Sequence, residues 1–139
     1  MELSDHFQPG MYKETVFDVT EEHSAIQLGS GSMRVLATPM MIRFMEITSH
    51  RLLEQRLPEG LSSVGIHVDV HHQAPTPINN QVRVRSEIVE LNESRVRFSV
   101  TAWDNFEQVG EGFHIRVVID LARFMKRVEE KKNALSRNK

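Results

Sequence analysis

The chain has 139 residues, which is the length of one ordinary domain, and we expect a single domain over residues 1–139. Its 17 Lys and Arg nearly balance its 19 Asp and Glu, which argues against a nucleic-acid partner, and the lack of cysteine excludes disulfides, Cys-ligated zinc and thiol catalysis. Its apolar runs are short and its first ten residues show no signal peptide, so we expect no membrane span and a cytoplasmic location.

The strongest helix signal in the chain begins at Thr38 and Pro39. A short strand is expected before it at residues 15–19, followed by a flexible Gly- and Ser-rich segment at 29–32. Threonine is a good N-cap and proline suits the first helical position. The helix should run to about residue 55 with one broad apolar stripe, so most of it should be buried. The stripe consists of Met40, Met41, Phe44, Met45, Thr48 and Leu52.

After Gly60 the apolar residues recur every second position, which is typical of β-strands. Four consecutive strands are expected near residues 64–72, 82–88, 96–102 and 109–119, with a tight turn at 104–105. In the last strand the apolar residues 113, 115 and 117 should share one face, which places His114 and Arg116 on the other. Residues 121–132 are predicted to form a charged helix and residues 136–139 a frayed tail.

This order of elements predicts an α+β fold. One long apolar helix and one sheet with a single apolar face must cover each other. A twisted antiparallel sheet wrapped around a central helix, the hotdog fold, meets that requirement, with the charged helix at its C-terminal end. Such a sheet leaves an open edge, so we expect a homodimer, which could pair further into a tetramer.

Three residues are candidates for chemistry. Thr38 lies where helix amides favour negative charge and could position a carbonyl or a water, although it could simply cap the helix. Glu46 lies on an apolar part of the same helix, so it is either a paired carboxylate, with Arg43 or His50 as partner, or a catalytic one. His72 breaks an apolar strand pattern at the strand's end, as a satisfied core residue or as a site residue.

Two other groups of residues have weaker functional interpretations. Two histidines and an aspartate lie at every second position on one strand face: His67, Asp69 and His71. They could chelate a cation, but no second element supplies ligands, so we expect no metal. Four arginines line the outer face of neighbouring strands: Arg83, Arg85, Arg95 and Arg97. Cross-strand pairing with acidic residues explains them better than a phosphate-binding site does.

Three stretches of the chain together resemble the fluoroacetyl-CoA thioesterase-like branch of the hotdog superfamily. These are residues 37–46 around Thr38 and Glu46, the strand containing Gly65 that ends in His72, and residues 114–118 around Arg116. The resemblance covers roughly residues 11–131, and it is the ordered set of motifs that is specific.

The resemblance implies an acyl-CoA thioesterase acting on a short or small acyl group. It implies that Thr38, Glu46 and His72 are catalytic, that Gly65 and Arg116 lie at the acyl-CoA pocket, and that the site is associated with a dimer. No cofactor is expected beyond the coenzyme A of the substrate. A non-catalytic acyl-CoA or small-ligand binding protein on the same scaffold is the alternative, and a hotdog dehydratase is the third possibility.

Overall fold

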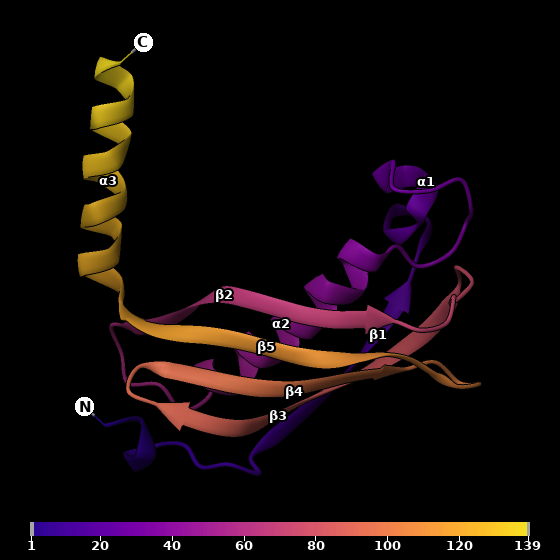
Figure 1. Ribbon diagram of the computed structural model, residues 1–139, viewed down its shortest axis with the longest axis horizontal. Coiled ribbons are helices and arrows are strands. Elements are labelled where there is room, and N and C mark those ends of the chain that lie inside the picture. The colour runs from indigo at the N-terminus through magenta and orange to yellow at the C-terminus, as the bar shows by residue number, and fades with distance from the viewer. Residues whose placement is uncertain (1, 139) are drawn as a thin grey trace.

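Five antiparallel strands form one sheet in the computed structural model, which describes residues 2–138 (Figure 1). The order across the sheet is β1-β3-β4-β5-β2, so β1 and β2 are the edge strands. The predicted run of four consecutive antiparallel strands after the helix is therefore confirmed. The strands are β1 (Tyr12–Val19), β2 (Leu61–His72), β3 (Asn80–Asn92), β4 (Arg95–Trp103) and β5 (Gln108–Asp120).

The long helix α2 (Thr38–Glu54) lies against one face of this sheet. Its predicted apolar stripe is confirmed, because Met41, Phe44 and Met45 are at most 2% exposed. The rings of Phe17 in β1 and Phe44 stack with centroids 4.2 Å apart. Burying an aromatic side chain of this kind stabilises the fold by about 1.5–3 kcal/mol. The sheet contributes its own buried row to this core, consisting of Val82, Val84, Ile88, Val96, Phe98 and Val100.

The start of α2 differs by one residue from the prediction. Ala37 is the N-cap, Thr38 is the first helical residue and Pro39 is the second. No side chain accepts a capping hydrogen bond there. The interpretation of Thr38 as a helix cap is therefore wrong, and its hydroxyl group is available for another partner.

A β-bulge between Gly65 and His67 shifts the pairing of β2 with β5. On β5, His114 and Arg116 face α2 and are 1% and 6% exposed, whereas Phe113 faces outward and is 39% exposed. The predicted division of this strand into two faces is therefore confirmed, but the polar face is the buried one. The polar residues are buried because side chains of β2 and α2 provide hydrogen-bonding and charged partners.

The remaining elements are short, apart from the C-terminal helix. They are the 3-10 helices η1 (Leu3–Asp5) and η2 (Glu21–His23), and the one-turn helix α1 (Ala25–Leu28). The helix α3 (Leu121–Arg137) extends beyond the predicted end at residue 132, so residues 136 and 137 of the predicted tail are helical, and residue 139 lies outside the described residues. It starts at an Asp120 cap and stands away from the sheet (Figure 1). Among residues 2–138, no helix combines the length and apolar character that a membrane span requires.

Candidate active site

Thr38 and His72 meet where the first turn of α2 approaches the end of β2. The Thr38 hydroxyl lies 2.7 Å from His72 Nδ1. His72 pairs across the sheet with Gly110, where an added Cβ would collide with the side chain of Met41. A glycine at this position therefore lets α2 pack close to the sheet, and this packing brings the helix start next to the strand end.

The His72 imidazole is half-buried, and its surroundings favour the neutral form of the ring. Burial lowers the pKa of His72 below its ordinary value, and the backbone of Ala74 partly opposes this change. Its Nε2 atom is shielded from solvent and has no hydrogen-bond partner within residues 2–138. With the ring proton on Nε2, the Nδ1 lone pair accepts the hydrogen bond from the Thr38 hydroxyl. This arrangement is suited to removing a proton from that hydroxyl or from a water beside it.

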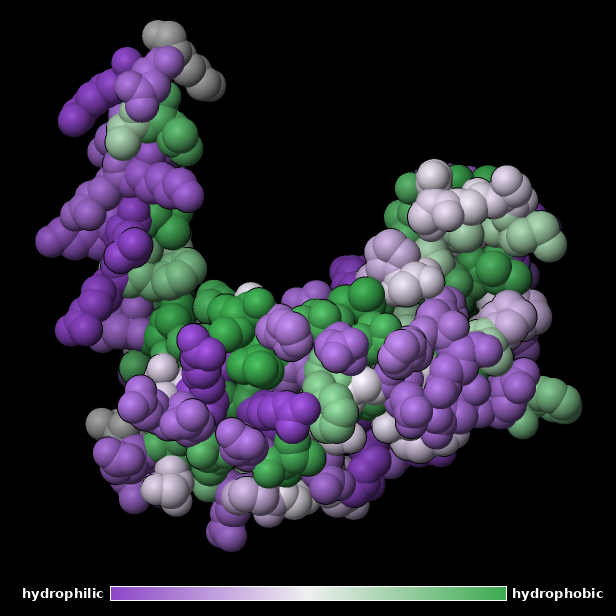
Figure 2. All heavy atoms as spheres, in the orientation of Figure 1, coloured by the Kyte–Doolittle hydropathy of each residue, from purple (hydrophilic) through white to green (hydrophobic). Residues whose placement is uncertain are grey.

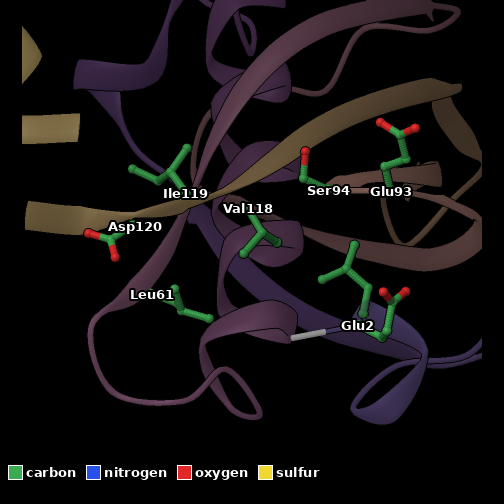
Figure 3. Close-up of a pocket in the computed structure, with 8 residues that line it drawn as sticks. Glu2, Leu61, Glu93, Ser94, Val118, Ile119 and Asp120 are labelled. Carbon is green, nitrogen blue, oxygen red and sulfur yellow. The ribbon is translucent and has the colours of Figure 1, made fainter. Parts of the chain in front are cut away.

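A hollow of about 300 Å³ opens beside this pair. It is bounded by small and turn-forming residues of the segment before α2 and of the loop after β2: Ala25, Ser30, Val35, Leu36, Ala37, Gln73, Ala74 and Pro75. A larger hollow of about 390 Å³ lies at the other end of β2, near Leu61 and Asp120 (Figure 3). The charged groups that line this second hollow are Glu2, Glu93 and Asp120. An adjoining hollow shares Val118, Ile119 and Asp120 with it and is lined by the basic residues Arg123, Lys126 and Arg127.

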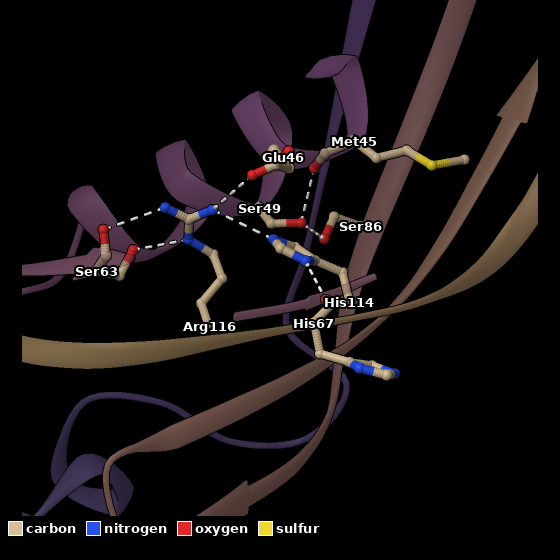
Figure 4. A network of polar contacts seen from close by, with 8 residues as sticks. All are labelled: Met45, Glu46, Ser49, Ser63, His67, Ser86, His114 and Arg116. Atoms are coloured by element: carbon tan, nitrogen blue, oxygen red, sulfur yellow. Dashed lines mark hydrogen bonds and ion pairs between the residues drawn. The ribbon is translucent and has the colours of Figure 1, made fainter. Parts of the chain in front are cut away.

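Glu46 lies in a second polar cluster, shown in Figure 4, two turns further along α2. Its Oε2 atom is 3.9 Å from Arg116 NH1. Within residues 2–138 the ion pair of Glu46 is with this strand residue and not with Arg43 or His50 on its own helix. Of the two interpretations of Glu46, the paired carboxylate is observed, with Arg116 as its partner in place of the expected Arg43 or His50, and its catalytic role stays a prediction.

Arg116 is held in place by hydrogen bonds on three of its atoms (Figure 4). Nε donates to Ser63 Oγ at 2.8 Å, NH2 donates to the Ser63 carbonyl at 3.1 Å, and NH1 lies 3.2 Å from His114 Nε2. His114 Nδ1 is 2.9 Å from the carbonyl oxygen of His67, which can only accept, so Nδ1 has the proton and Nε2 accepts from Arg116. Burial lowers the pKa of His114 and also that of Arg116, where the Glu46 charge opposes it.

Gly65 leaves the space in which these groups meet. A Cβ atom at this position would lie 3.0 Å from Glu46 Oε2, 3.1 Å from His114 Cε1 and 3.3 Å from Arg116 NH1. All three distances are tighter than ordinary van der Waals contact. The absence of a side chain at Gly65 therefore allows Glu46 to reach Arg116.

The candidate residues thus form two groups rather than one. Thr38 and Glu46 are eight residues apart on α2, or about 12 Å along its axis. Gly65 and His72 are seven residues apart on β2, or about 23 Å. The structure brings Thr38 to His72, and brings Glu46 to Gly65 and Arg116, but one chain does not bring the two groups together.

Ser63 and His114 were missed as functional candidates. Each is a polar residue next to an apolar one: Ser63 precedes Val64, and His114 lies between Phe113 and Ile115. His114 pairs across the sheet with Phe98 and Arg116 with Val96, and both partners are buried in the core, so the β5 residues lie on the buried face. Ser63 lies on the same face, two residues before Gly65, which pairs with Arg116. Knowledge of the pairing between β4 and β5 would have placed His114 and Arg116 on the buried face.

The other histidines and arginines do not form a second site. Within the described part of the chain, no cluster of three or more His, Asp or Glu side chains has an arrangement that could hold a metal. Arg83 pairs with Glu14 at 3.2 Å and Arg85 with Glu87 at 2.8 Å. The expected pairing with acids is confirmed for Arg83 and Arg85, whose cross-strand partner is Glu14, whereas Arg97 lies over the Phe113 ring.

Comparison with known proteins decides the family. The profile of the fluoroacetyl-CoA-specific thioesterase family, FlK, matches residues 19–122. A fluoroacetyl-CoA thioesterase from Streptantibioticus cattleyicolor is 34% identical over 97 residues, which are 70% of each chain. This chain belongs to the fluoroacetyl-CoA-specific thioesterase family. The resemblance inferred from the ordered motifs is therefore confirmed.

Solved structures of relatives confirm the hotdog fold of this family member. A structure of the fluoroacetyl-CoA thioesterase FlK superposes with a TM-score of 0.85 at 28% identity, covering 90% of this chain and 97% of that one. A hot-dog-like protein from Thermanaerovibrio acidaminovorans gives a TM-score of 0.88 at 27% identity, covering 94% and 97%. The predicted α+β hotdog architecture is therefore confirmed.

Proposed function

We propose that this family member is an acyl-CoA thioesterase that hydrolyses a short acyl group from coenzyme A. The observation that carries the proposal is the 2.7 Å contact between Thr38 and the half-buried His72 beside an open hollow. A hydroxyl group with a base next to it is suited to attack on an acyl carbonyl, directly or through a water. The hollow of about 300 Å³ suits a small acyl group.

We propose that Glu46 reaches this site from a second copy of the chain. Strand β2 is a sheet edge, and its residues 65–69 are exposed. Antiparallel pairing of two β2 edges about His67 would bring the partner's Gly65 to about 10 Å from His72 along the strand, against about 23 Å within one chain. The partner's Glu46 and Arg116 would then face the Thr38–His72 pair across the interface.

The residues have distinct roles in the proposed site. His72 accepts a proton from the attacking oxygen, and Thr38 provides or positions that oxygen at the start of α2. The partner's Glu46 orients the attacking group or the thioester, and Arg116 fixes the position of its carboxylate. Gly65 provides the open space that the carboxylate and the acyl chain need. The reaction uses no cofactor beyond the coenzyme A of the substrate, and we expect it to take place in the cytoplasm.

Hydrolysis of acetyl-, fluoroacetyl- and longer acyl-CoA esters by the wild-type protein and by His72→Ala tests this function. His71→Ala is the matched control, because His71 is the adjacent, exposed residue of the same strand. We expect wild-type turnover of short esters, its loss in His72→Ala and its retention in His71→Ala. Equal turnover by both variants would contradict the assignment of His72. Binding of the esters without any turnover would instead indicate a binding protein.

A further inference from the structure

The helix α3 has an apolar stripe that its own chain leaves uncovered. Leu121, Met125, Val128 and Leu135 are each between 44% and 56% exposed, and their spacing places them on one face of the helix. In Figure 2 the hydrophobic colour follows the side of α3 that borders the broad hollow above β2. A helix of this kind needs a partner surface to be stable in water.

The charge of α3 is opposite to that of the rest of the chain. Six of its 17 residues are Lys or Arg and two are Glu, which gives the helix a net charge of +4. Because the whole chain carries −2, the other 122 residues carry −6. A second copy of the same chain therefore offers a surface of complementary charge.

The position of α3 directs it toward such a copy. The helix leaves the end of β5 across the direction of the strands and projects beyond the free edge of β2 (Figure 1). Its 17 residues span about 25 Å, which is about five strand spacings. If two β2 edges pair antiparallel, the Leu61 end of one strand lies beside the His72 end of the other. The helix then runs along the end of the partner's sheet where β2 ends and β5 begins.

That end of the sheet has an exposed apolar residue and two acids. The turn between β4 and β5 exposes 89% of Phe106, with Asp104 and Glu107 on either side of it. Together with Pro75 and Pro77 of the loop after β2, this turn borders a hollow of about 390 Å³. The turn and the loop thus provide the apolar and acidic groups that a basic, apolar-striped helix would bind.

We propose that α3 of each chain docks across these strand ends of a second copy, with its apolar stripe on the partner's Phe106. The proposal rests on the β2-edge dimer of the proposed function. The distance from the end of β5 to the partner's turn between β4 and β5 is three and a half strand spacings, or about 17 Å. About 11 residues of helix span this distance. The contact therefore falls between Val128 and Leu135. The loop after the partner's His72 lies directly below, so α3 would also border the partner's site.

Cysteine cross-linking tests this contact, since the chain has no cysteine of its own. Asn105→Cys next to Phe106 is combined with Val128→Cys or Leu135→Cys and treated with a short bismaleimide. Asn105 and the α3 positions lie beyond opposite ends of β5, about 40 Å apart in one chain. A link between them can therefore form only between two chains. Asn133→Cys, on the polar face of α3, replaces the stripe residue in the control pair. We expect covalent dimers from the stripe pairs and few from the control pair.

A second measurement examines the energetic contribution of α3 to the dimer. Val128→Glu introduces a charge into the apolar stripe, and Asn133→Glu introduces the same charge on the opposite face. We expect Val128→Glu to raise the dimer dissociation constant in sedimentation equilibrium about tenfold or more, and Asn133→Glu less than about twofold.

Different results would separate the failure of this proposal from the failure of the proposed function. An active dimer that forms no cross-link and tolerates Val128→Glu would overturn the docking of α3 and leave the thioesterase assignment intact. A monomeric or inactive wild-type protein would contradict the proposed function as well. Val128-dependent binding to phosphatidylserine vesicles, with an unchanged dimer constant, would overturn the proposal in favour of a membrane surface as the occupant.

Discussion

Replacing Arg116 by Met tests whether the buried polar cluster stabilises the fold. The guanidinium group is 6% exposed and makes hydrogen bonds of 2.8–3.2 Å to Ser63 and His114. Arg116→Met keeps most of the side-chain volume but leaves the Ser63 carbonyl and His114 Nε2 buried without their donor. Each such group costs about 1–3 kcal/mol, so we expect the free energy of unfolding to fall by about 2–5 kcal/mol.

Urea unfolding followed by the fluorescence of Trp103, the single tryptophan, measures this change. Protein concentration is held constant because a dimer's stability depends on it. Arg97→Met is the control, since Arg97 lies over the Phe113 ring at 4.0 Å on the outer face and should contribute less than about 1 kcal/mol. Unchanged or increased stability of Arg116→Met would mean that the cost of burying the charge exceeds its interactions, and would refute this reasoning.

Three further predictions concern activity. Burial lowers the pKa of His72, and catalysis needs the neutral ring. We therefore expect kcat/KM to fall as the pH drops, with the midpoint of the fall below about pH 6.5. A midpoint above that pH would contradict the assignment of His72 as the base. Thr38→Val should lower kcat about 10²–10⁴-fold, while Thr38→Ser should stay within about tenfold of the wild type, and equal rates for both would exclude a role for the hydroxyl. Gly65→Ala should displace the Glu46 carboxylate and lower kcat about tenfold with little loss of stability, as steady-state kinetics and thermal unfolding together would reveal.

The order of elements in this fold could be predicted from the sequence because the apolar period changes clearly. Apolar residues recur with the period of a helix around Phe44 and at every second position after Gly60. Those two patterns require a helix and a sheet that cover each other, which is enough to predict the architecture. The spacing of His72 also correctly placed it at the end of its strand, and the structure adds that the start of α2 lies next to it.

The buried cluster could not be predicted in the same way. The alternation of Phe113, Ile115 and Val117 indicates an apolar face, yet His114 and Arg116 are the buried residues. Their burial depends on partners far away in the sequence: Ser63 and Glu46 for Arg116, and the core residues of β4 that the two pair with across the sheet. The Thr38 hydroxyl was similarly misread as a cap because its partner is 34 residues away. Local patterns contain no information on such long-range contacts.

Mixing two inactive variants tests the shared site most directly. In a dimer of one Glu46→Gln chain and one His72→Ala chain, a site built from both chains would be doubly altered on one side and fully wild-type on the other. Random exchange makes half of the dimers mixed, so the account predicts recovery of about a quarter of the wild-type acyl-CoA hydrolysis. Recovery of no activity from a mixture shown to contain mixed dimers would contradict a site that takes Thr38 and His72 from one chain and Glu46 from the other.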